Sequence, residues 1–284
     1  MAAVTRRFAG FVLAELLVAM VVAAIIGVAL TQLIISQSRF VALQSGVMQA
    51  RGGARAALNV MATDLRMVTD SGLVAASPES VTVRVAYAFG VACRQSGGTT
   101  IVSLLPADSA TYFSATLTGY GWRDTAGAYV YVEPAAVASP SAPLSSCTGA
   151  SPPITTLSTL AWPARAVGLQ PNDVRTPPGT VVYLYQLVRY AFAPSGELPG
   201  RIGLWRRVLS TGASDELVAP FDTSAGFRFL VGSALTPRVT PPADLNTVQG
   251  LRLVLVSQSE QPPEGRTTPV MFNLTTNVIF RNHP

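Results

Sequence analysis

The side chains that ordinarily carry out chemistry are few in this sequence of 284 residues. The only histidine is His283, next to the last residue, and the only cysteines are Cys93 and Cys147. A Ser-His-Asp triad would depend on a histidine at a frayed chain end, and no segment has the spacing of a phosphate-binding loop or a dinucleotide fingerprint. We therefore expect neither enzymatic activity nor a bound cofactor.

The acidic residues and the cysteines predict no metal site. Asp215–Glu216 and the pair Glu260 and Glu264 lack the oxygen-ligand spacing of an EF-hand, and two cysteines alone do not make a zinc site. We expect these carboxylates to lie in solvated loops. If the body of the chain lies outside the cytoplasm, the two cysteines are expected to form a disulfide; the alternative is two unpaired, buried thiols.

The charge of the chain argues against a nucleic-acid partner. The net charge is +5, and all 20 basic residues are arginines. They are scattered, with no group denser than the pairs Arg6–Arg7 and Arg206–Arg207, whereas nucleic-acid binding requires a basic stripe or cluster. Only 12% of the residues are charged, against about 25% in an ordinary soluble domain. These numbers indicate a weakly charged body joined to a very apolar segment.

One carboxylate stands in that apolar segment. From Phe11 to Ile35 the sequence FVLAELLVAMVVAAIIGVALTQLII contains no charge other than Glu15. As a helix with a rise of about 1.5 Å per residue, this stretch is long enough to cross a hydrocarbon core of roughly 30 Å. A secretory signal would be shorter and would end at a small-residue cleavage site. An ordinary membrane anchor would have no reason to carry a carboxylate that costs about 2.5–3.5 kcal/mol near the bilayer centre.

The residues around Glu15 suggest a third interpretation. The short basic segment that ends at Gly10, followed by Phe11 and the run to Met20, resembles the type IV prepilin signature Gly-Phe-Thr-Leu-Ile-Glu-Leu; Val12 and Ala14 depart from it conservatively. The resemblance covers about the first thirty residues. It implies that a membrane peptidase cleaves between Gly10 and Phe11 and that the new amine is methylated.

Cleavage there would give the carboxylate a partner. The α-amine of Phe11 would be a cation inside the membrane, and Glu15 would supply the matching anion, either within one helix or between neighbouring subunits. An ionisable residue inside a membrane is usually functional because burying it without a role is costly. We therefore expect Glu15 to act in assembly.

A second apolar pattern follows the membrane segment. Apolar residues recur every three or four positions, at Phe40, Leu43, Val47, Ala50, Ala54, Leu58, Met61, Leu65 and Val68. This spacing predicts one face of an amphipathic helix that continues from Phe11 to about residue 70, with a possible bend at Gly52–Gly53. The alanine-rich part also resembles the corresponding helix of PilW-type minor pilins.

After Gly72 the period changes to two, which predicts strands. Candidates are residues 80–89, 99–105, 111–118, 128–132, 181–192, 203–209, 226–232, 250–257 and 270–280. Residues 133–180 contain nine of the 21 prolines and are expected to form a long loop or insertion. The predicted fold is α+β: leader 1–10, helix 11–70 with a transmembrane part 11–35, and a β-rich, mostly antiparallel domain 71–284. Tyr183, Tyr185 and Tyr190 are expected to pack in the sheet rather than to line a ligand groove.

The resemblance implies a structural role. We expect a minor pilin, anchored once in the inner membrane with its N-terminus in the cytoplasm and its body in the periplasm, and extracellular once assembled. Expected partners are the prepilin peptidase, other minor pilins and the major pilin. The alternatives are a J-type minor pseudopilin of type II secretion, whose C-terminal half the strand order also resembles, and a tip adhesin or DNA-uptake module.

Overall fold

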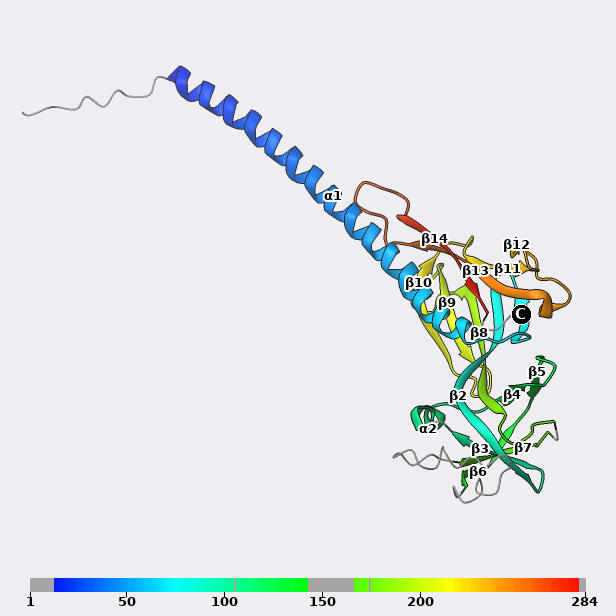
Figure 1. The fold of residues 1–284 in the computed structure, drawn as a ribbon. Coiled ribbons are helices and arrows are strands. Elements are labelled where there is room, and N and C mark those ends of the chain that lie inside the picture. Colours follow the sequence, from blue (N-terminus) through cyan, green and yellow to red (C-terminus); the bar gives the residue numbers. More distant parts are fainter. Residues whose placement is uncertain (1–12, 105, 143–165, 174, 281–284) are drawn as a thin grey trace, which may run out of the picture.

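A long helix and a β-rich body make up the protein in a computed structural model, which describes residues 13–104, 106–142, 166–173 and 175–280. The helix is α1 (Leu13–Arg66), and a short helix α2 (Pro106–Ser114) lies within the body (Figure 1). The strands are β1 (Leu73–Ser77), β2 (Ser80–Ser96), β3 (Thr99–Leu104), β4 (Gly119–Arg123), β5 (Tyr129–Val132), β6 (Ala136–Ala142), β7 (Ala166–Gln170), β8 (Val181–Pro194), β9 (Ile202–Val208), β10 (Ser214–Phe221), β11 (Gly226–Val231), β12 (Thr236–Arg238), β13 (Val248–Gln258) and β14 (Met271–Ile279).

The last turns of α1 pack on the sheet through small side chains. Ala50, Ala54, Met61 and Leu65 are buried, as the apolar spacing predicts. The helix continues through Gly53, where an added Cβ would come within 2.8 Å of a serine hydroxyl on β13. Alanine and glycine therefore bring the helix axis close to the sheet, and the buried apolar face fixes which side of α1 the body covers.

The strands form one strongly curved antiparallel sheet. In the described residues it has fourteen strands, with the central order β12-β11-β13-β10-β9-β8-β2-β3-β7-β6. Its side chains build two separate hydrophobic cores. The first core lies between α1 and strands that include β9, β11, β13 and β14, and we call this part the proximal lobe. The second core lies among β3, β4, β7 and α2, and we call this part the distal lobe.

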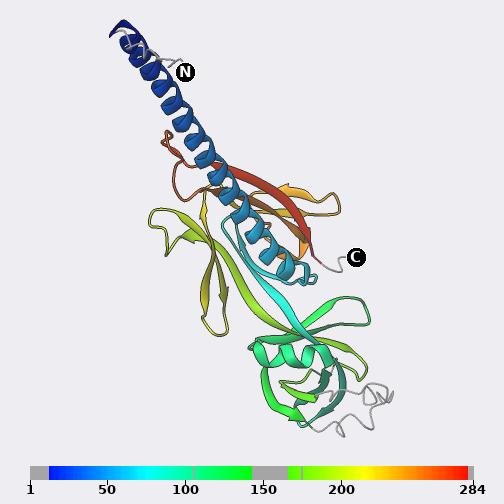
Figure 2. The same cartoon turned by 90° about the vertical axis from the view of Figure 1, so that its left-hand side faces the viewer.

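Two long strands belong to both lobes. Val81, Val83 and Val85 of β2 lie in the proximal core, whereas Ala88 and Ala92 of the same strand lie in the distal core. Strand β8 is divided in the same way, and it pairs with β2 from Ser80↔Ala191 to Val91↔Val181. A β-bulge in β2 between Ala86 and Ala88 marks the passage from one lobe to the other. The distal lobe lies at the end of the molecule farthest from the start of α1 (Figures 1 and 2).

The predicted α+β class, with one long N-terminal helix and a large antiparallel sheet, is confirmed at that level. Two local predictions were wrong. Residues 111–118, expected as a strand, begin inside α2, which starts with a proline and has Asp108 in its first turn, both typical of a helix start. Of the two forms expected for residues 133–180, the continuous loop is wrong, because β6 and β7 pair there at the edge of the sheet, where prolines are tolerated; the insertion stays a prediction.

Candidate functional site: an exposed apolar helix and its attachment to the body

The N-terminal part of α1 is the most unusual surface of the protein. Every residue from Glu15 to Val41 is exposed, although nearly all are apolar as far as Ile35. In the part of the chain that the structure describes, α1 is the one helix long and apolar enough to cross a membrane. A single exposed helix of this kind is unfavourable in water, since each fully exposed large apolar side chain forgoes about 1.5–3 kcal/mol of burial. It must be covered by lipid or by protein.

Glu15 lies beside an apolar strip on this helix. Val18, Val22 and Ile26 line the same surface depression as the carboxylate, together with two alanines. The carboxylate therefore shares one helix face with side chains that lipid or a second helix would cover. Gly10 and Phe11, the expected cleavage site, lie outside the described residues, and the pairing of Glu15 with the processed amine stays a prediction.

A loop of the body contacts α1 just after the apolar segment. This β13–β14 loop comprises residues 259–270. The Ser38 hydroxyl donates to Glu264 Oε2 over 3.2 Å, and the Glu260 N–H donates to Gln49 Oε1 over 3.1 Å. Between these bonds Gly46 is buried, and an added Cβ would meet Val270 at 3.2 Å. The loop therefore holds about three turns of α1 at a fixed distance from the sheet.

A polar network inside the proximal lobe attaches the C-terminal end of α1. Asp64 on the helix accepts a hydrogen bond of 2.5 Å from the hydroxyl of Tyr190 on β8, and it forms an ion pair of 3.2 Å with Arg206 on β9. Arg206 Nε also donates to the Tyr190 hydroxyl oxygen over 3.3 Å. Burial, together with the negative charge of Asp64, raises the pKa of Tyr190, so the hydroxyl keeps its proton. Because Asp64, Tyr190 and Arg206 contact one another, the network fixes the rotation of α1 about its own axis.

A second polar cluster joins the end of α1 to the distal lobe. Arg84 on β2 donates to the carbonyl of Ser71 over 2.9 Å and pairs with Glu133 over 3.1 Å. Its guanidinium stacks over the Tyr131 ring with 4.4 Å to the centroid. The Tyr131 hydroxyl donates to the Asp70 carbonyl over 2.7 Å, and burial raises the pKa of this hydroxyl to about 12. The cluster holds the two lobes and the helix end in one arrangement.

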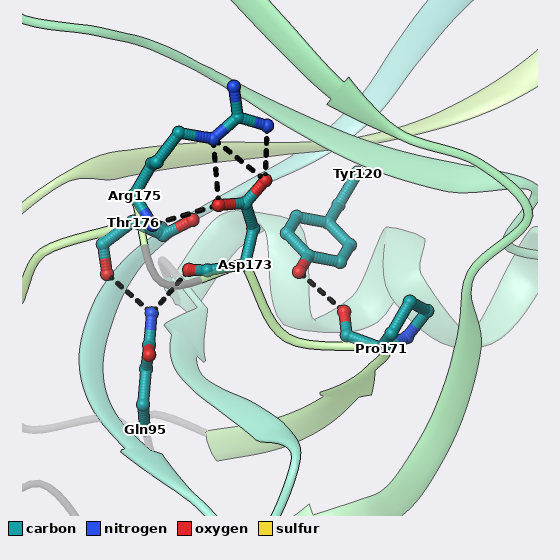
Figure 3. A network of polar contacts seen from close by, with 6 residues as sticks. All are labelled: Gln95, Tyr120, Pro171, Asp173, Arg175 and Thr176. Carbon is teal, nitrogen blue, oxygen red and sulfur yellow. Dashed lines mark hydrogen bonds and ion pairs between the residues drawn. The ribbon is translucent and has the colours of Figure 1, made fainter.

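A third polar network, in the distal lobe, fixes the loop between β7 and β8 (Figure 3). The Gln95 amide donates to the carbonyls of Asp173 and Thr176 over 2.5 and 2.9 Å. Arg175 binds the Asp173 carboxylate through two nitrogens, the shorter distance being 2.6 Å, and this holds the pKa of Asp173 below its usual range. Nearby, the Tyr120 hydroxyl donates to the Pro171 carbonyl. These hydrogen bonds hold the backbone of the loop in place, and none of them pairs a nucleophile with a general base.

No group of three or more His, Cys, Asp or Glu among the described residues is placed to hold a metal ion. The expectation that Asp215 and Glu216 lie in a solvated loop was wrong, because both belong to strand β10. Asp215 is exposed, whereas Glu216 is half-buried, and its carboxylate accepts from the N–H groups of Gly196 and Glu197. Glu260 and Glu264 lie in the β13–β14 loop. Cys93 is buried in β2 and disulfide-bonded; Cys147 lies outside the described residues, as does His283.

The three tyrosines considered as ligand-lining residues have different surroundings. Tyr190 and Tyr185 are buried, in agreement with packing in the sheet. Tyr183 is half-buried and contacts Phe89 and Tyr129 at ring-centroid distances of 5.5 and 5.9 Å. No sequence pattern singles out Asp64 as an attachment point, since its partners Tyr190 and Arg206 lie more than a hundred positions away. Comparison with protein-family models, with curated proteins and with solved structures found no match.

Proposed function

We propose that this protein is a minor pilin, which enters a type IV pilus through α1 after its leader has been removed between Gly10 and Phe11. The observation that carries the proposal is the uninterrupted exposure of α1 from Glu15 to Val41 beside its firm attachment from Ala50 onward. Such a helix suits two successive surroundings, the bilayer before assembly and a bundle of like helices afterwards. The prepilin peptidase, the major pilin and other minor pilins are the proposed partners.

The proposed topology has one crossing of the inner membrane. Two arginines precede the apolar run, and positive charge favours the cytoplasmic side. The body would then lie in the periplasm, and at the filament surface after assembly. A J-type minor pseudopilin of type II secretion uses a helix in the same way and is the alternative within this class.

The proposal is tested by the mature N-terminus and by one substitution. Mass spectrometry should find a chain that begins at Phe11, methylated or free; any other start refutes the leader assignment. Glu15→Ala should still insert in the membrane but should enter filaments poorly, because the apolar helix stays long enough to span while the proposed anion is lost. Glu79→Ala, which removes an exposed carboxylate from the body, is the matched control. Normal incorporation of Glu15→Ala would exclude the pairing.

A binding role for the body is the second candidate. Exposed Arg189 and Arg207 lie directly opposite each other on β8 and β9, but a pair is smaller than the basic stripe that DNA capture requires.

A further inference from the structure

The strand β14 has one open edge. Among the described strands it pairs with β13 alone, over its whole length and without a register shift. Just beyond its two ends, the Phe280 N–H donates to the Gln249 carbonyl, and the Val270 carbonyl accepts from the Ser259 N–H. Bonded residues alternate along an antiparallel ladder, so the even-numbered residues of β14 bond to β13. The main-chain groups that point to the open edge are those of Met271, Asn273, Thr275, Asn277 and Ile279.

This edge lacks the features by which proteins usually prevent pairing with another chain. Such features are short length, charge, proline and bulges. Strand β12, at one end of the sheet, has only three residues, which include Pro237 and Arg238, and β6, at the other end, has two register shifts. By contrast, β14 has nine residues and contains no charge, no proline and no bulge. An extended chain can therefore add to it as a further strand.

A row of arginines on α1 borders the open strand. Arg51, Arg55 and Arg66 are separated by four and eleven positions, close to whole numbers of helical turns, so they lie on one face of α1. All three are exposed. The Arg51 guanidinium lies 5.9 Å from the ring centroid of Phe272 on β14, and Arg66 lines a groove of about 280 Å³ with Asn277 of β14. Figure 2 shows β14, in red, alongside the helix. We call these three residues the arginine row.

The arginine row has no acidic partner within the chain. Every Asp and Glu of the sequence lies in the described residues, and the ion pairs formed there hold Arg84, Arg175 and Arg206. Arg66 is in the last turn of α1, where the helix dipole favours a cation. Arg55 lies about three turns earlier, beyond the reach of that effect. Unpaired cations thus lie beside unpaired main-chain donors and acceptors.

We infer that the open edge of β14 and the arginine row together bind an acidic, extended segment of another protein. Because Phe272 lies near Arg51 and Asn277 near Arg66, β14 runs in the same direction as α1. A segment that adds antiparallel to β14 therefore begins at Arg66. Along the helix, Arg55 and Arg51 follow at about 16 and 22 Å. At about 3.3 Å per strand residue, carboxylates at positions 1, 5 and 7 of the segment match this row on one face.

The test uses the full chain in detergent and fluorescent nine-residue peptides, with binding followed by anisotropy. The probe has glutamate at positions 1, 5 and 7 and alternating threonine and valine elsewhere; its control has glutamine at those three positions and should bind about tenfold more weakly. Arg55→Gln and Arg66→Gln should each weaken binding of the glutamate probe about two- to fivefold. Arg207→Gln, which removes an exposed arginine from β9, should have no effect.

Two further probes test the addition of a strand. Glutamate peptides are N-methylated on either the odd or the even amides; one of the two should lose binding and the other should keep it, because alternate amides face β14. In the free chain the amides of Asn273 and Thr275 should exchange hydrogen quickly and that of Leu274 slowly, and the glutamate probe should protect the first two. Thr275→Pro, at an edge that tolerates proline, should abolish binding while Leu274 stays slow.

Several results would overturn the inference. These are no binding of the glutamate probe, equal binding of the glutamate and glutamine peptides, and binding that leaves the Asn273 and Thr275 amides unprotected. Protection of these amides without peptide, lost on dilution, overturns it in favour of a second copy of this chain. Tighter binding of oligodeoxythymidine than of the probe, falling steeply with salt, overturns it in favour of single-stranded DNA. No filament is needed, so each failure leaves the proposed minor-pilin role standing.

Discussion

Removing the carboxylate of Asp64 should loosen the attachment of α1 to the sheet. In Asp64→Ala, the Tyr190 hydroxyl loses its 2.5 Å acceptor inside the core, and Arg206 loses its counter-ion. Leaving a buried hydroxyl short of a partner costs about 1–3 kcal/mol. The ion pair adds about 0.5–1 kcal/mol, since the side chains remain 20% and 26% exposed. After about 0.5 kcal/mol is subtracted for the better helix propensity of alanine, we expect the free energy of unfolding to fall by about 1–3.5 kcal/mol.

The loss can be measured globally and locally. Urea unfolding of the full chain in detergent, followed by tryptophan fluorescence, gives the free energy of unfolding; Trp205 lies next to Arg206 on β9. Hydrogen exchange of α1 from Ala50 to Arg66 should become faster in Asp64→Ala. Asn59→Ala changes an exposed residue in the same turns and controls for helix propensity; it should be neutral or slightly stabilising.

A double-mutant cycle isolates the contact. Tyr190→Phe removes only the hydroxyl, so Asp64→Ala with Tyr190→Phe should cost less than the sum of the two single changes, by about 1 kcal/mol or more. Strict additivity, or an unfolding midpoint for Asp64→Ala equal to that of wild type, would refute the view that this network holds the helix.

Three further perturbations address other parts of the molecule. Gly46→Leu should displace the β13–β14 loop and speed its hydrogen exchange, because a Cβ there already meets the loop; Gly52→Leu, which faces open space, should not. Gly121→Val should lower the free energy of unfolding in urea by about 1–3 kcal/mol through overpacking against the neighbouring Tyr131 ring. The Asp173 carboxyl, followed by NMR, should titrate below its ordinary pKa of about 3.9, and Arg175→Leu should return it toward that value. Because this pKa is lowered, its contribution to stability is present above the unfolded pKa and is lost as pH falls through the folded value.

Apolar spacing along the sequence predicts those helices and strands that bury one face. The helix to Arg66 and the alternating strands, such as β2 and β13, follow from apolar spacing alone. The same stripe also predicted burial of Phe40, which is 61% exposed; the body contacts α1 nearby through Ser38 but leaves the Phe40 ring uncovered. Sequence spacing reports which side chains are apolar, and cannot report where the covering surface ends.

The strands that the sequence did not predict lack an alternation of apolar and polar residues. Strand β4 reads Gly-Tyr-Gly-Trp-Arg, and its glycines are required by rings that come from β5 and β8. The same holds for the polar networks. Asp64, Tyr190 and Arg206 are distant in sequence and meet only because the sheet brings β8 and β9 under the last turns of α1. Such sites depend on strand order, which local patterns do not encode.

The strands shared by the two lobes have a mechanical consequence. β2 and β8 run from the lobe that holds α1 into the distal lobe, paired over most of their length (Figure 2). Because each strand contributes to both cores, the lobes cannot be pulled apart along the strands without drawing β2 and β8 out of one core. A pull on the distal lobe, with the helix held fixed, would therefore be opposed by buried side chains of both cores, whereas two domains joined by a flexible linker would first swing apart.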